Sequence, residues 1–145
     1  MEPGFTPLLK SNIMKYFFNV TPETVSAPTP LFAGLFVDQG GPESNELVIG
    51  TGSYARAPIS FVESNGVVKN VEAVTFPKST ASWTPNTYRI THLGIFTSHK
   101  VEDSEEYVSD EKDSLIAFLP LAEAEIVEEG QTFQLNPQTV KLQLV

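Results

Sequence analysis

The sequence Ile90-Thr91-His92-Leu93-Gly94-Ile95-Phe96 predicts a β-strand, because β-branched and aromatic residues dominate it. The segments on either side have the same character. Toward the N-terminus, Leu31–Val37 is an almost continuous apolar run of strand length. Toward the C-terminus, Val140–Leu144 alternates strictly between apolar and polar residues, so one face of that strand is expected in the core and the other in water. The chain is therefore expected to be all-β.

Turn residues separate these strands at regular intervals. Asp38–Pro42 predicts a turn, and Ser64-Asn65-Gly66 predicts a hairpin, since Asn and Gly adopt positive φ at little cost. About eight to ten short strands separated in this way indicate an antiparallel β-sandwich, or a flattened barrel. The further strands expected are Tyr54–Val62, Val71–Phe76, Thr87–Phe96, Leu115–Leu119 and, beyond Pro120, Ala122–Val127.

The N-terminal region is expected to differ from the rest. Thr6 can cap a helix and Pro7 suits its first position, where the missing N–H needs no partner. Val20–Pro30 is rich in Pro and Thr and predicts an extended arm. Residues 1–30 are therefore expected to form a short helix and an arm, and residues 31–145 a single β-sandwich domain. The apolar side of the helix recurs at helical spacing and consists of Leu8, Leu9, Ile13, Tyr16 and Phe17.

Composition excludes several classes of protein. The chain has 145 residues and a formal net charge of −9, from 18 acidic and 9 basic residues. This balance opposes binding to nucleic acid and to anionic membrane surfaces, and it leaves proteins as the expected partners. The absence of Cys excludes disulfides, thiolate zinc sites and cysteine nucleophiles. No run approaches the roughly 18 apolar residues of a membrane helix.

Residues that could carry chemistry are few. His92 is the one plausible catalytic imidazole, with His99 a distant second. Ser53 does not lie in the strand–elbow–helix pattern of a hydrolase, and Gly50 and Gly52 are expected to form a turn before a strand rather than a phosphate loop. We expect His92 to be hydrogen-bonded and packed beside Trp83 or Tyr88, and Trp83 itself to anchor the core. The sequence thus predicts no catalytic residue, no cofactor and no metal site.

One segment is strongly acidic. It spans residues 102–113 and predicts a solvated hairpin tip, since clustered carboxylates repel one another and are costly to bury. A weak site for a divalent ion is the alternative, although the spacing fits no known loop pattern. The seven carboxylates are Glu102, Asp103, Glu105, Glu106, Asp110, Glu111 and Asp113.

Several short motifs, taken in order, resemble a family of small tailed-bacteriophage virion proteins whose members often carry the label tail fibre. The motifs are Tyr54-x-Arg56, Phe76-Pro77, Trp83 and Thr91-His92-x-Gly94-Ile95-Phe96. The similarity runs from Leu8 to the C-terminus. The chain departs from the family at Thr84–Asn86, where a Gly is common, and at residues 100–114, which are longer and more acidic than usual.

The resemblance implies a non-enzymatic virion structural protein. A capsid decoration (cement) protein bound to the major capsid protein is expected first, and a tail fibre or tail-tip component bound to other tail proteins second. A carbohydrate-binding β-sandwich, which would expose Trp83, and a hydrolytic or metal-dependent enzyme are the alternatives from other classes. A homo-oligomer such as a trimer is expected. Neighbouring chains are expected to contact the N-terminal helix and arm through Leu8, Leu9, Ile13, Tyr16, Phe17 and Val25.

Overall fold

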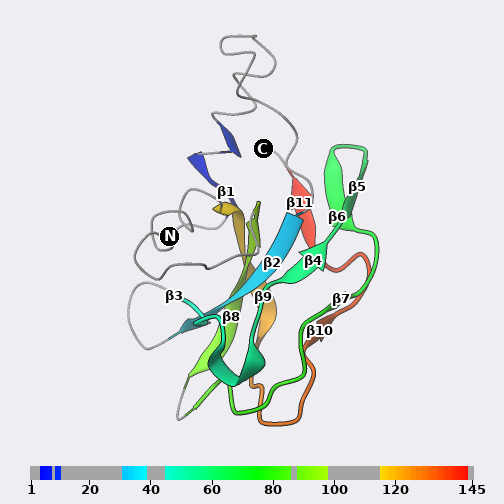
Figure 1. Ribbon diagram of the computed structural model, residues 1–145. Helices are drawn as coiled ribbons and strands as arrows, with labels where there is room; N and C mark the ends of the chain where they lie inside the picture. The colour runs from blue at the N-terminus through cyan, green and yellow to red at the C-terminus, as the bar shows by residue number, and fades with distance from the viewer. Residues whose placement is uncertain are drawn as a thin grey trace.

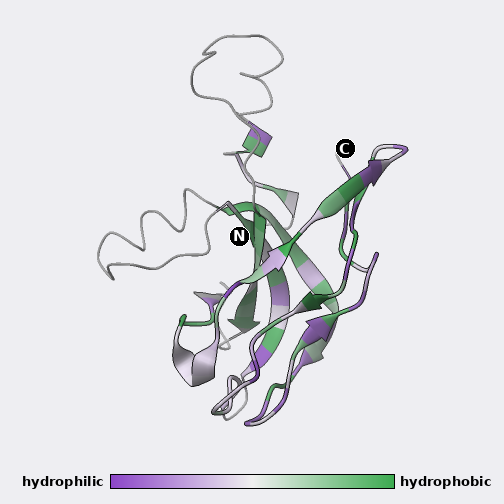
Figure 2. Ribbon diagram, turned by 45° about the vertical axis from the view of Figure 1, so that its right-hand side comes forward, coloured by the Kyte–Doolittle hydropathy of each residue, from purple (hydrophilic) through white to green (hydrophobic). Residues whose placement is uncertain are grey.

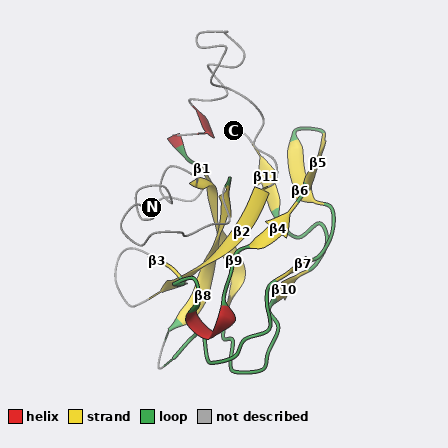
Figure 3. Ribbon diagram, viewed as in Figure 1, coloured by secondary structure: helices red, strands yellow, loops and turns green. Residues whose placement is uncertain are grey.

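The computed structural model describes residues 4–7, 9–10, 31–38, 45–85, 88–97 and 115–143. Their regular structure is almost entirely antiparallel β-sheet, which confirms the all-β prediction (Figures 1 and 3). The strands are β1 (Gly4–Phe5), β2 (Leu31–Asp38), β3 (Asn45–Glu46), β4 (Ala57–Ile59), β5 (Phe61–Ser64), β6 (Val67–Asn70), β7 (Val74–Thr75), β8 (Arg89–Phe96), β9 (Leu115–Glu125), β10 (Gln134–Leu135) and β11 (Lys141–Gln143). A short 3-10 helix, η1 (Thr51–Ser53), precedes β4.

The main sheet has six strands and is organised around β8. Its order is β1-β9-β8-β2-β3, and β4 pairs with β2 on the same edge as β3. β8 therefore has a long partner on each side, β2 and β9. Both predicted strands, Ile90–Phe96 and Leu31–Val37, lie at the middle of this sheet, where their nearly continuous apolar sequence is buried on both faces.

A pair of glycines lets two phenylalanine rings lie flat on one face of this sheet. Gly34 of β2 and Gly94 of β8 are directly opposite each other. A Cβ atom on Gly94 would lie 2.5 Å from Phe36 Cε1, and one on Gly34 would lie 2.7 Å from Phe96 Cε2. The two rings stack with centroids 6.1 Å apart and planes within 1°. The glycines are thus required by packing rather than by a turn.

Two smaller sheets complete the sandwich-like fold. β5, β6 and β11 form one, and β7 and β10 form the other. The predicted hairpin joins β5 to β6 through Asn65 and Gly66, whose φ angles are 54° and 80°. The predicted C-terminal strand pairs with β6 and keeps its alternation, since Val140 is buried and Lys141 is exposed. Figure 2 shows this hairpin projecting from the body of the molecule.

Aromatic rings fill the core. Trp83, Tyr54 and Phe76 are each 1 % exposed. Tyr54 contacts Trp83 edge to face at 5.4 Å and stacks on Phe76 at 6.3 Å. The indole N–H of Trp83 donates to the carbonyl oxygen of Gly52 at 2.9 Å, so its one polar atom is satisfied. The prediction that Trp83 anchors the core is confirmed.

Three predicted strand boundaries are wrong. Of the predicted strand Val71–Phe76, only Val74–Thr75 is a strand, β7. The segment predicted as one strand, Tyr54–Val62, contains β4 in the main sheet and β5 in the three-stranded sheet, because the chain passes from one sheet to the other at Ser60. Pro120, in contrast, does not separate two strands but lies within β9. The pairing jumps there: His92 lies opposite Pro120 and Ile90 opposite Glu125, so a wide bulge accommodates the residue that lacks an N–H.

The N-terminal residues join the main sheet before any helix begins. β1 pairs with β9, and the Thr6 hydroxyl donates to the carbonyl oxygen of Leu115 at 2.7 Å. The N–H of Lys10 donates to the carbonyl oxygen of Thr6 at 3.1 Å, which closes one helical turn at the predicted cap. The structure gives no support to the predicted helix beyond this turn, since its remaining residues and the arm Val20–Pro30 lie outside the described ranges.

The glycine pair generates the first testable prediction. We expect Gly94→Ala to lower the free energy of unfolding by about 1–3 kcal/mol, because the new methyl group overlaps the Phe36 ring. Phe36→Leu alone is also destabilising, since it leaves a cavity beside Phe118. In urea denaturation the double variant should lose less stability than the sum of the two single variants. Strict additivity would show that the ring and the glycine are not coupled.

Candidate functional site

The imidazole that the sequence singles out has structural partners. His92 lies on β8, and its Nδ1 atom is 2.8 Å from the hydroxyl of Thr91. Its ring stacks on Phe118 with centroids 4.7 Å apart and planes within 7°. The expectation that His92 is hydrogen-bonded and packed is confirmed, although the ring it stacks on is Phe118, not Trp83 or Tyr88. His99 lies outside the described residues.

The glycine-containing turn before β4 serves packing. Its central residue Gly52 has a φ of 53°, and a Cβ there would lie 2.9 Å from the Trp83 ring. Ser53 also has positive φ, and its hydroxyl is 2.9 Å from the hydroxyl of Thr80 rather than from a base. The expected turn is therefore present, and it leads into the core Tyr54 and then β4 instead of into a helix.

Metal-binding and sugar-binding chemistry find no support in the described part of the chain. Within it, no three His, Cys, Asp or Glu side chains come together as a metal site would require. The acidic segment 102–113 lies outside the described residues, so both predictions made for it remain predictions. Trp83 is buried and cannot serve as the exposed platform that a carbohydrate-binding module uses. No helix among the described residues is long and apolar enough to cross a membrane.

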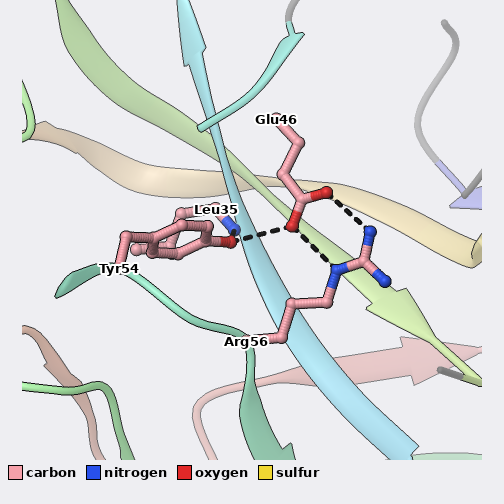
Figure 4. Close-up of polar contacts among 4 residues, drawn as sticks. All are labelled: Leu35, Glu46, Tyr54 and Arg56. Atoms are coloured by element: carbon pink, nitrogen blue, oxygen red, sulfur yellow. Dashed lines mark hydrogen bonds and ion pairs between the residues drawn. The ribbon is translucent and has the colours of Figure 1, made fainter. Parts of the chain in front are cut away.

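A buried ion pair lies on the same face of the main sheet as the phenylalanine rings. Arg56 donates from Nε to Glu46 Oε2 at 2.8 Å and from Nη2 to Glu46 Oε1 at 2.7 Å (Figure 4). The Arg56 side chain is 0 % exposed and the Glu46 side chain 5 %. The guanidinium also lies 3.5 Å from the centroid of the Phe96 ring. Such a planar, two-pronged contact holds the carboxylate in one orientation.

Tyr54 links this ion pair to the backbone of β2. Its hydroxyl donates to Glu46 Oε2 at 2.9 Å and accepts the N–H of Leu35 at 2.8 Å. Burial, and then the negative charge of Glu46, raise the pKa of the Tyr54 hydroxyl well above its ordinary value. Every member of the network has a partner. None of these residues lines the cleft beside β9 that is described below. The arrangement can hold strands together but offers no access to a substrate.

An open cleft lies between the second half of β9 and the segment that contains β10. Its volume is about 640 Å³. Glu123 and Glu125 are the charged residues of its lining. Apolar side chains form much of the rest, among them Leu119, Leu121, Phe133 and Leu135. Sequence reasoning missed this cleft, because it depends on the bulge in β9 and on which strands pair around it.

The contact residues predicted for the N-terminal helix and arm are mostly outside the described ranges. Leu9 is the exception: it is partly buried and packs against the core of its own chain. The other five, Leu8, Ile13, Tyr16, Phe17 and Val25, lie outside the part whose side chains the structure describes. Their contact with a neighbouring chain stays a prediction.

The ion pair predicts an asymmetric response to substitution. Arg56→Met alone should lower the free energy of unfolding by about 3–5 kcal/mol, because it leaves the Glu46 carboxylate buried without its cation. The double variant Arg56→Met, Glu46→Gln should be more stable than Arg56→Met, since it removes the uncompensated charge. Denaturant unfolding of the four proteins measures the coupling. A double variant less stable than Arg56→Met would contradict this.

The raised pKa of Tyr54 predicts a pH dependence. In the unfolded chain the hydroxyl ionises near its ordinary pKa of 10.0, whereas in the folded chain it stays protonated. The folded state then binds more protons, so its stability is complete below pH 10 and falls as the pH rises above it. Tyr54→Phe should be about 1–3 kcal/mol less stable at pH 8, because Leu35 N–H loses its acceptor, and should show a shallower loss above pH 10. Tyr88→Phe, outside this network, is the matched control.

The comparisons with known proteins agree with the resemblance carried by the sequence motifs. A family model described as podophage GP4 fiber I protein gp80 matches residues 4–143. Among curated proteins, none matches the chain. The family match includes the buried Tyr54 and Arg56, the core Trp83 and the central strand β8. The family match spans nearly all of the 145 residues. The chain therefore belongs to the family of podophage GP4 fiber I protein gp80, a family of virion structural proteins of tailed phages.

Proposed function

We propose that this protein is a non-enzymatic structural subunit of a tail fibre in a podophage-type virion, and that it works through protein–protein contacts. The observation that carries the proposal is the family match over residues 4–143 to a protein described as a fibre component. The partners are then other tail proteins and further copies of the chain, and the location is the virion. This choice reverses the order expected from the sequence, which put capsid decoration first.

The described structure supports a structural role. The candidate catalytic side chains have structural partners. His92 stacks on Phe118, and the Ser53 hydroxyl is hydrogen-bonded to the Thr80 hydroxyl. The buried charges of Arg56 and Glu46 are paired with each other. A fully satisfied buried network of this kind suits a subunit with a fixed shape, because such networks rigidify the core around them.

Capsid decoration remains the second candidate, because one observation argues against an elongated shaft. The sequence contains no internal repeat, and a repeat is what such a shaft would use. A compact subunit of this kind fits a lattice site on the head, or a junction within the tail, equally well. The two candidates differ in copy number, a handful for a tail component and hundreds for a decoration protein.

Labelling of virions distinguishes the two. Virions are labelled with gold-conjugated antibody against the chain and imaged, and the copies per particle are counted by quantitative mass spectrometry. We expect label at the tail and a low copy number. Label distributed over the head with hundreds of copies would establish decoration instead. A chain absent from purified virions would contradict both candidates.

A substitution tests the predicted role of the N-terminal helix. The triple variant Ile13→Ser, Tyr16→Ser, Phe17→Ser removes apolar side chains predicted to contact a neighbour, while it leaves β1 and Thr6 in place. We expect incorporation into virions to fall at least about ten-fold, since burying such side chains contributes roughly 1.5–3 kcal/mol each. Immunoblotting of purified virions measures it, and Val71→Ser, at an exposed position, is the control. Unchanged incorporation would show that this helix does not contact a partner.

A further inference from the structure

The second half of β9 carries backbone groups that no described strand uses. Among the described residues, β1 pairs with Ala117 and Phe118 and does not reach this region. On the other side, β8 pairs with Pro120 and then with Glu125, which leaves Leu121–Ala124 without a partner on β8. Residues 122–126 are exposed, so the described chain leaves this stretch open to solvent. An extended, exposed backbone of this kind is a template for another strand.

A second short strand lines the same cleft. β10 pairs with β7 through Gln134 and Leu135, and this sheet has no third strand among the described residues. Both residues line the cleft, as do residues 119–123 of β9. The cleft of about 640 Å³ therefore lies between two stretches of strand that have no further strand partner in the part of the chain that the structure describes.

The residues that line the cleft indicate which side chains a bound segment would carry. Leu119, Leu121, Phe133 and Leu135 supply apolar surface, and the charged groups of the lining are two carboxylates. An extended segment presents alternate side chains to opposite sides. Leu119, Leu121, Glu123 and Glu125 occupy alternate positions of β9, and all four line the cleft. A segment whose cleft-facing side chains are apolar beside the two leucines and basic beside the two carboxylates therefore fits this lining. A second copy of the chain, which carries its own net charge of −9, is electrostatically the wrong partner.

We propose that this cleft binds an extended, basic segment of a different protein by strand addition to β9. The segment pairs its backbone with Leu121–Ala124, and its Lys or Arg side chains lie against Glu123 and Glu125. The identity of the partner as a neighbouring virion protein rests on the proposed function. The binding mode does not, because it follows from the open strand, the cleft and its charge. Strand addition supplies affinity through the backbone and specificity through alternate side chains.

A peptide of defined sequence serves as the probe. The probe has eight residues, the length of 119–126. Its cleft-facing positions carry valine opposite Leu119 and Leu121 and lysine opposite Glu123 and Glu125, and its other positions carry threonine. Its binding to the full-length protein is measured by calorimetry and by amide hydrogen exchange. We expect exchange at Leu121–Ala124 to slow by at least about ten-fold at saturation, since opening of the new strand pairing is then required. Raising the salt from about 50 mM to about 500 mM should weaken binding, because exposed charges are screened.

Matched peptides and variants make the test specific. A valine–glutamate peptide and a lysine peptide with N-methylated backbone amides should each bind at least about ten-fold more weakly. Glu123→Gln and Glu125→Gln should each weaken the lysine peptide about two- to five-fold, as is typical of exposed ion pairs. Glu72→Gln, an exposed carboxylate outside the cleft, should change nothing. No slowing of exchange at Leu121–Ala124, or equal binding of the glutamate peptide, would overturn the proposal.

A second copy as the occupant has its own signature. If exchange at Leu121–Ala124 slowed with protein concentration and without peptide, the cleft would be a contact between copies, and the proposal would be wrong. The chain has no native cysteine, so Ala122→Cys adds a single site for a thiol-reactive cross-linker and reports which chain lies nearby. These measurements use the isolated protein. If the peptide does not bind, the proposed tail location is unaffected. If virion labelling contradicts the tail location, the proposed binding in the cleft is unaffected.

Discussion

The Tyr54 hydroxyl occupies the one gap on the outer edge of β2, and the arrangement of the main sheet depends on it. β4 pairs with Leu31–Ala33 and β3 with Phe36–Val37, so two short strands share this edge in succession. Between them, the N–H of Leu35 donates to the Tyr54 hydroxyl. That hydroxyl in turn donates to Glu46, which Arg56 holds by two hydrogen bonds. A buried backbone donor is thereby satisfied, and β3 and β4 are fixed relative to each other.

The same network closes the outer face of the sheet. Arg56 lies flat over Phe96, and the paired Gly34 and Gly94 give the phenylalanine rings room against the backbone. Both faces of β8 are consequently buried, one by the core of the sandwich and the other by this aromatic and charged layer. A buried charge without its partner costs several kcal/mol, so Arg56 and Glu46 each depend on the other. A buried polar network whose members are all satisfied favours a rigid sheet.

That rigidity sets the context for the cleft beside β9. β9 is held on one side by β8 and at its start by β1, yet its second half leaves the ladder in a wide bulge. A subunit of a virion must present its contact surfaces in a fixed geometry, since a preordered surface loses less conformational entropy when it binds. The chain's family is one of virion structural proteins, which is consistent with such a surface. The chain's negative charge makes basic partners the favoured ones.

Local patterns determined much of this fold from the sequence alone. Asn65-Gly66 specified a hairpin by its backbone preferences, the alternation before residue 143 specified a half-buried strand, and Trp83 was recognisable as core by its size and apolar character. Only the tertiary structure decided the rest. Glu46 pairs with Arg56 ten positions away, Pro120 lies inside a strand because of a register shift, and His92 stacks on Phe118 of another strand. The cleft likewise arises from which strands pair and where pairing stops. Those choices depend on contacts between residues distant in sequence, and no local pattern records them.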